Sequence, residues 1–468
     1  MTGPERERHY RLGPLEHRGL VAGWRPGQVI SAGVACTLAA VVLSISTAMG
    51  AALGAISLVV LGLCVATVPV AGRTIDEWVP SLVAHVRRRG TRTMLRLEVV
   101  DAELLGGREG VGVALQPTGS ISVTMALEST GISLLDPNRR DQRVAGLIAA
   151  LGALAREGSV VDRIGWSASC VVDWGAELSA DLRRRGAGGE EAAIEMYRTL
   201  LADVASQGLS RRVHLTLRTS PGVRRPGGAI EALLAEAALV SQALEDAGHR
   251  PCRLLSATDL ADAIATELGG EVTAETDPGG RAGAKTAMSP HRPTAVGCRF
   301  LVVASGTARL GSIETAGRHT ATWWVAQWPR TEVTAELLAP VLLGHEGHSM
   351  SVVIEPVPPS IAMRRAASAR TSGAADTEIR RRGGFLSDRR RDAEAAHLET
   401  REAELVDGHG SLRFAGFLAT SAHSAEALAE RAAETELAAA QSRLEVRRLV
   451  GDHGRGLLAT LPLAMGLP

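Results

Sequence analysis

Aromatic residues and lysine are scarce in this sequence. Phe, Trp and Tyr together make up 3% of the 468 residues, and Lys285 is the only lysine. With so few aromatic side chains, the hydrophobic cores must be packed mainly with Leu, Val, Ile and Ala. The 51 basic and 51 acidic side chains cancel, so the net charge gives no reason to expect nucleic-acid binding. We therefore predict no direct contact with nucleic acid.

Cysteines are also few, and their spacing is irregular. No pair of them has the spacing of a disulfide framework or of a zinc site. This pattern predicts a reduced, cytoplasmic environment for the chain outside residues 29–71, and we expect neither a metal nor another cofactor. The five are Cys36, Cys64, Cys170, Cys252 and Cys298.

No ionisable side chain occurs between residues 29 and 71. A bilayer core needs roughly 20 apolar residues per helix, so this run is long enough for two passes with a turn at Met49-Gly50. Arginines flank the run on both sides, and positively charged flanks face the cytoplasm. We predict a two-helix transmembrane hairpin in a multi-pass plasma-membrane protein with both termini cytoplasmic. A buried helical hairpin in a soluble protein is the alternative.

Composition and periodicity divide the chain into six segments. After the hairpin, strand-like and helix-like patterns alternate, which is typical of a sandwich of the ferredoxin-like kind. The predicted fold class is an α+β membrane protein, in which the transmembrane hairpin precedes cytoplasmic ferredoxin-like α/β sandwich subdomains. The segments are a basic head (1-28), the hairpin (29-71), a juxtamembrane helix (72-100), an α+β subdomain (101-268), a linker or mobile loop (269-295) and a second α+β subdomain (296-468).

Individual elements are predicted from the spacing of apolar residues. Helical spacing follows Asp136-Pro137 as far as about Arg156. A long helix is expected from Ser424 to Leu449, with Phe414 and Phe417 of the preceding strand in its core. Further helices are predicted at residues 190–206 and 228–247, and strands at residues 111–115, 121–127, 160–172, 212–217, 296–304, 319–327, 350–355 and 412–418.

The segment from Gly279 to Thr286 comes closest to a phosphate-binding loop. Such a loop needs Gly immediately before its lysine, but Ala284 precedes Lys285. Two prolines downstream, at positions 290 and 293, prevent the helix that should follow the loop. A linker with one lysine is therefore the favoured interpretation.

Two further motifs were weighed as sites. His345-Glu346-Gly347-His348 is one residue shorter than the zinc-protease spacing, and its glycines argue against a helix. Because two histidines on a turn are usually solvated, we predict no metal site there. Arg380–Arg382 and Arg389–Arg391 are interspersed with acidic residues and indicate a solvated charged face. No pattern indicates a catalytic nucleophile, so we predict that the protein is not an enzyme.

The amino-terminal part resembles an actinobacterial membrane protein family related to the PrgI family. The resemblance covers most of residues 8 to 175. It is carried by Arg11–Leu20, Gly72–Trp78, Ser133–Pro137, Gln142–Gly146 and Leu154–Ser159.

The carboxy-terminal half resembles the amino-terminal, non-catalytic domain of TraC/TrbE-type conjugation ATPases. In that family a Walker loop and a motor domain follow shortly after a Leu-Pro-Leu, whereas this sequence ends at Pro468. The resemblance therefore does not imply ATPase activity. It is carried by Glu399–Leu405, Gly410–Leu418, the long helix that follows, Arg447–Leu449 and Leu461–Leu463.

Together these resemblances imply an inner-membrane scaffold component of a type IV-like conjugation or secretion apparatus. The expected partners are the membrane, a separate hexameric TraC/TrbE-like ATPase, a polytopic membrane channel component and further copies of the chain. The candidate partner-docking residues are Arg447, Arg448 and Arg455, whose side chains we expect to be free. An EccE-like membrane component of a type VII (ESX) secretion system is the alternative, and a membrane-tethered nucleotide-binding enzyme is a remote third.

Overall fold

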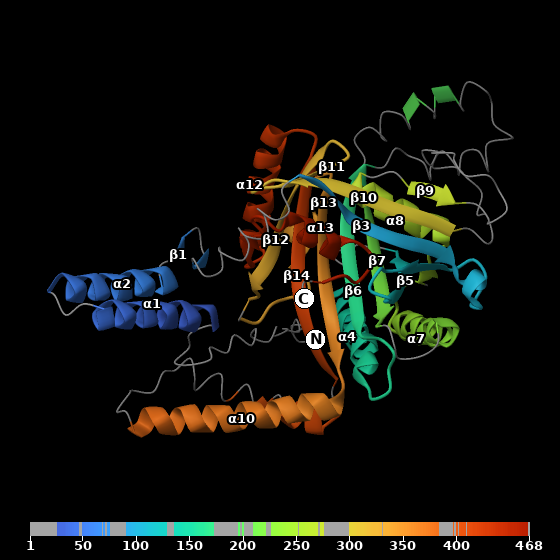
Figure 1. The fold of residues 1–468 in the computed structure, drawn as a ribbon. Helices are drawn as coiled ribbons and strands as arrows, with labels where there is room; N and C mark the ends of the chain where they lie inside the picture. The colour runs from blue at the N-terminus through green and yellow to red at the C-terminus, as the bar shows by residue number, and fades with distance from the viewer. Residues whose placement is uncertain are drawn as a thin grey trace, which may run out of the picture.

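The computed structural model of the chain describes most of the residues after the amino-terminal head (Figure 1). The described residues are 26–45, 49–67, 69–70, 73–74, 90–128, 135–172, 195–196, 199–200, 209–220, 226–250, 252–269, 272–275, 299–329, 331–382, 396, 399–400, 402–408 and 410–466.

The first two helices, α1 (Pro26–Ile45) and α2 (Met49–Thr67), pack against each other through small side chains such as Ala39 and Ala55. Neither they nor any other helix in the described part of the chain combines the length and apolar character needed to cross a bilayer. The predicted transmembrane hairpin is therefore wrong, and so is the multi-pass plasma-membrane localisation derived from it.

Short strands β1 (Pro69–Val70) and β2 (Arg73–Thr74) follow α2 and pair with each other. The main sheet comes next. Its principal strands are β3 (Thr91–Asp101), β4 (Gly112–Leu115), β5 (Ile121–Leu127), β6 (Arg163–Val172), β7 (Leu209–Thr219), β10 (Arg299–Ala308), β11 (Ile313–Thr315), β12 (Arg318–Gln327), β13 (His348–Val357) and β14 (Ser411–Ala422). Shorter strands at its margins are β8 (Arg253–Leu254), β9 (Val272–Glu275) and β15 (Glu445–Arg448).

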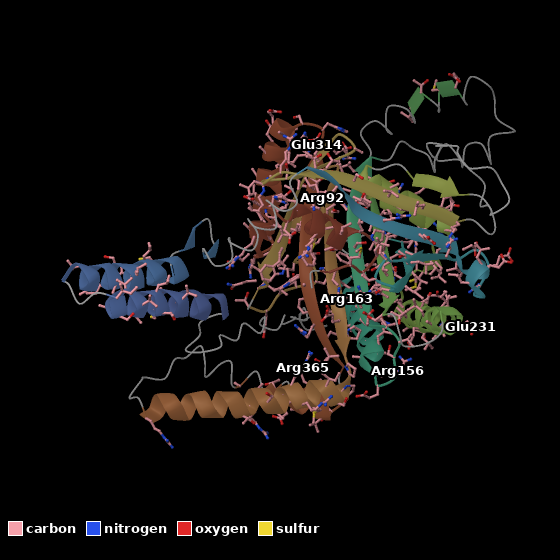
Figure 2. The ribbon with its side chains drawn as sticks, in the orientation of Figure 1. Arg92, Arg156, Arg163, Glu231, Glu314 and Arg365 are labelled. Carbon is pink, nitrogen blue, oxygen red and sulfur yellow. The ribbon has the colours of Figure 1, made fainter. Side chains whose placement is uncertain are left out.

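The pairings of the main sheet close on themselves. The order is β11-β10-β3-β4-β5-β7-β6-β13-β14-β12, and β11 also pairs with β12. Every one of these ladders is antiparallel. Arg92 of β3 and Glu314 of β11 mark one end of the sheet in Figure 2.

This topology corrects the predicted fold class. Ferredoxin-like sandwich subdomains would each keep a sheet of their own. Instead, β10 pairs with β3 and β13 pairs with β6, so strands from the two halves of the chain form one sheet. Local periodicity predicts the strands but not which distant strand each one meets.

One outer face of the sheet is covered by α4 (Pro137–Gly152) and α7 (Pro226–Asp246). The Asp136 side chain caps α4 by accepting a hydrogen bond from the backbone of Arg139 (3.0 Å), as the Asp-Pro pair predicted. Beneath the two helices lies a core of aliphatic side chains from β4, β5, β6 and β7. Short 3₁₀ turns η1 (Ala102–Leu105) and η3 (Ala153–Ala155) border it.

A second outer face, on β12, β13 and β14, is covered by α9 (Ala339–Leu342) and α12 (Ala425–Gln441). Ser424 caps α12 through its hydroxyl oxygen, which accepts from the backbone of Ala427 (3.1 Å). The predicted helix from Ser424 to Leu449 is too long, because α12 ends at Gln441 and β15 begins four residues later. The structure therefore places Arg447 and Arg448 on a strand.

The inner face of the sheet encloses α8 (Ala257–Leu268), α13 (His453–Thr460) and the Leu-Pro-Leu segment after α13. Leu461 and Leu463 are buried, and the carbonyl oxygens of Pro462 and Leu463 accept hydrogen bonds from Thr124 (2.9 Å) and Gln116 (3.0 Å). Phe417 of β14 is buried as predicted, but it packs against Ala459 of α13 on this side and not in the core beneath α12, where Phe414 packs. The carboxy-terminal segment thus fills the sheet interior.

The helix α10 (Pro359–Arg382) extends from the end of β13 and runs away from the sheet (Figure 1). Arg156 and Arg365 lie near the place where it leaves (Figure 2). Residues 91–100, at the end of the expected juxtamembrane helix (72-100), form part of β3 instead. Residues 75–89 of that expected helix lie outside the described part of the chain. Several other predicted segments also lie largely or wholly outside the described part of the chain. They are the basic head, the helix at 190–206, most of the loop at 269-295 and the Arg389–Arg391 cluster.

Candidate functional site

The candidate docking arginines lie on β15 and α13. The ladder with β12 sets Arg447 opposite Trp324 and Arg448 opposite Trp323. Successive residues of a strand point to opposite faces, so these two arginines face opposite sides of the sheet. Trp323 packs in the core beneath α12, whereas Trp324 packs beside Ala459 of α13.

Arg448 is held in place by its neighbours. Its Nη2 donates to the carbonyl oxygen of Gly311 (2.8 Å), and its guanidinium carbon lies 5.5 Å from the centroid of the Trp323 ring. A cation over an aromatic face is attracted by the ring's quadrupole. Arg448 thus ties β15 to the turn between β10 and β11.

Arg447 and Arg455 lie on the α13 side and are more accessible. Arg447 forms an ion pair with Glu445 (3.7 Å), and Arg455 with Asp452 (3.7 Å), with 24% and 47% of the arginine side chains exposed. The expectation that the three arginines are free is therefore wrong. The more exposed of the two, Arg455, contributes little energy through its ion pair, because solvent screens exposed charges.

The His345–His348 motif forms a tight turn before β13. Gly347 adopts φ +73°, a left-handed conformation that favours glycine. At Gly344, a Cβ atom would lie 2.8 Å from the imidazole of His348, so only glycine allows that ring to approach. The turn was correctly predicted as non-helical, but the expectation of solvated histidines is wrong for His348, which is 3% exposed.

The two histidines line a cavity of about 220 Å³ between α9, α12 and the turn. The His345 Nδ1 donates to the carbonyl oxygen of Glu346 (2.9 Å), and its Nε2 is hydrogen-bonded to the Thr420 hydroxyl (3.2 Å). Glu434 of α12 lies 3.9 Å from the same Nε2. The cavity is lined by Pro340, Val341, Leu343, Gly344, His345, His348, Glu434, Thr435 and Ala438.

His348 is the most unusual group in this cavity. A backbone hydrogen bond with Val341 engages one ring nitrogen and acts to raise the pKa, while the other nitrogen has no partner in the described part of the chain. Burial lowers its pKa to about 4, and the neighbouring His345 acts in the same direction. The imidazole is therefore neutral near pH 7, with the lone pair of one ring nitrogen unused.

A metal is not indicated by the geometry of this cavity. Within the described ranges, no three or more His, Cys, Asp or Glu side chains are placed so that they could hold a metal ion together. Sequence reasoning noticed the two histidines but not Glu434 and Thr420, which lie far away along the chain. No local signal could have brought them together.

The other sequence motifs add nothing to either site. Lys285 and the glycines before it lie outside the described residues. Arg380–Arg382 form the end of α10, remote in sequence from β15 and from the cavity.

No protein-family model matches the chain, and no curated protein matches it.

Proposed function

We propose that this protein is a non-catalytic docking component of a type IV-like conjugation or secretion apparatus, which binds a separate hexameric ATPase of the TraC/TrbE type. The resemblance of its carboxy-terminal segments to the non-catalytic domain of those ATPases supports this proposal. Those segments, β14, α12, β15 and α13, are neighbours in space as well as in sequence.

The observation that carries the proposal is that β15 and α13, which bear Arg447 and Arg455, both adjoin β12. Each of these two arginines is ion-paired to a carboxylate near it in sequence, and Arg448 fixes the strand that bears Arg447. Guanidinium groups bind carboxylates through two parallel hydrogen bonds. An acidic patch on the ATPase is the matching partner surface.

The short strand β15 supports the same assignment. In the described part of the chain it pairs with β12 and with no other strand. The second edge of β15 has no strand partner among the described residues. A partner can add backbone contacts at such an edge, and the arginines then select an acidic partner.

Co-purification tests this proposal. Charge reversal at both positions, Arg447→Glu with Arg455→Glu, should abolish recovery of the ATPase with the tagged protein and lower DNA or protein transfer in cells. The matched control is Arg250→Glu, because Arg250 is also exposed and ion-paired, to Glu128. Equal recovery with all three proteins would refute docking through this surface.

A further inference from the structure

The cavity beside α12 has two polar ends of different character. At the inner end, His348 is 3% exposed, and one of its ring nitrogens has no partner within the described residues. At the outer end, the side chain of Glu434 is 66% exposed. Between them, Val341, Leu343 and Ala438 form an apolar wall.

The inner end offers a ring nitrogen that can accept a hydrogen bond from a ligand. A neutral imidazole offers one N–H donor and one acceptor nitrogen, and a hydroxyl group matches either role. A buried polar group without a partner costs free energy, so a ligand that supplies the missing hydrogen bond binds favourably. A charged group at this depth would lose its hydration.

The outer end requires a cation. Among the described residues, the Glu434 carboxylate is the acidic group that lines the cavity, and no lysine or arginine lines it. The nearby Arg431 and Arg318 are directed toward Glu346 (3.7 and 3.9 Å), so they offer no anion site here. An ammonium group fits the carboxylate, whereas a ligand carboxylate or phosphate would be repelled.

The size of the cavity limits the ligand to a few non-hydrogen atoms. Its volume of about 220 Å³ is below the range of roughly 300–1,000 Å³ that is usual for drug-sized ligands. We propose that this cavity binds a short aliphatic amino alcohol, whose hydroxyl group hydrogen-bonds His348 and whose ammonium group pairs with Glu434.

Three matched probes test the proposal on the full chain by calorimetry and by the NMR signals of the histidine rings. They are 4-amino-1-butanol, n-butylamine and 1-butanol. We expect the amino alcohol to bind about tenfold more tightly than the amine, which lacks the inner hydrogen bond. It should bind about threefold more tightly than the alcohol, which lacks the exposed ion pair.

Variants on α12 locate the binding. Ala438→Leu should fill the cavity and remove binding, while Ala440→Leu, on the opposite side of the helix, should leave it unchanged. Glu434→Gln should remove the advantage of the amino alcohol over 1-butanol. Equal affinity for all three probes, no binding at all, or undiminished binding to a folded Ala438→Leu protein would each overturn the proposal. The ranking of the probes tests it even if that variant does not fold.

Discussion

Two buried histidines should make the protein sensitive to mild acid. His214 of β7 and His348 of β13 are both largely inaccessible, and burial lowers each pKa to about 4 from an ordinary value of 6.5. Positive charge on Arg212 and Arg253 adds to the effect at His214. In the unfolded chain both imidazoles regain ordinary proton affinity, so acid favours unfolding.

The sign and size of the effect follow from linkage. Each histidine has a depressed folded-state pKa, so its contribution to stability is present above pH 6.5 and is lost as the pH falls toward 4. Each pKa unit corresponds to about 1.4 kcal/mol, so the full loss is about 3 kcal/mol per histidine. Between pH 7.5 and pH 5 the loss is about 2 kcal/mol for each, or about 4 kcal/mol together. That is a large part of a typical folding free energy.

Buried carboxyl groups act in the opposite direction. Burial raises the pKa of Glu267 and of Asp262 on α8, so these groups favour the folded state as the pH falls. Comparing variants at the same pH removes their contribution. The relevant quantity is therefore the change in the pH dependence, not the stability of the natural protein alone.

Urea unfolding, followed by circular dichroism between pH 7.5 and pH 5, measures this dependence. The double variant His214→Gln with His348→Gln should lose about 4 kcal/mol of the pH dependence over that interval, whatever its stability at pH 7.5. His423→Gln, on an exposed histidine, should keep the slope of the natural protein. An unchanged slope in the double variant would refute the reasoning.

Other substitutions test the packing. Phe417→Ala should lower the free energy of unfolding by about 3–5 kcal/mol, because this side chain is 1% exposed inside the sheet; a loss below 1 kcal/mol in urea unfolding would contradict that burial. Gly344→Ala should cost about 1–3 kcal/mol by pushing the His348 ring out of place, and it should shift that ring's NMR signals; unchanged signals would contradict the close approach. Ser424→Ala should cost about 1 kcal/mol in the same unfolding assay through loss of the α12 cap, and an unaltered midpoint would argue against the cap.

Local sequence patterns predicted the individual elements well but not their assembly. The Asp136-Pro137 start of α4, the strand at residues 121–127 and the burial of Phe417 all follow from neighbouring residues, and the structure confirms them. The closure of the sheet depends on pairings such as Arg299 with Val100, which are about 200 residues apart. Nothing in the period of a strand states its distant partner, so the ferredoxin-like prediction failed there.

In the candidate site, too, local sequence predicts some features and not others. A turn at Gly347 could be predicted from the residue type, and its left-handed conformation agrees. The burial of His348 could not be predicted, because it depends on α12 and α9 closing over the turn. The predicted helix through Arg447 failed because the apolar period continues past Gln441 to Leu444 and Leu449, which are buried at the two ends of β15.

Direct titration of the purified protein with a TraC/TrbE-type ATPase from the same organism tests the central claim. Saturable binding is expected, weakening as salt rises because the contact is between exposed charges. The Arg447→Glu, Arg455→Glu protein should bind at least about tenfold more weakly, and Arg250→Glu should bind normally. Absence of binding by the natural protein, or the same affinity in the charge-reversed protein, would contradict the account.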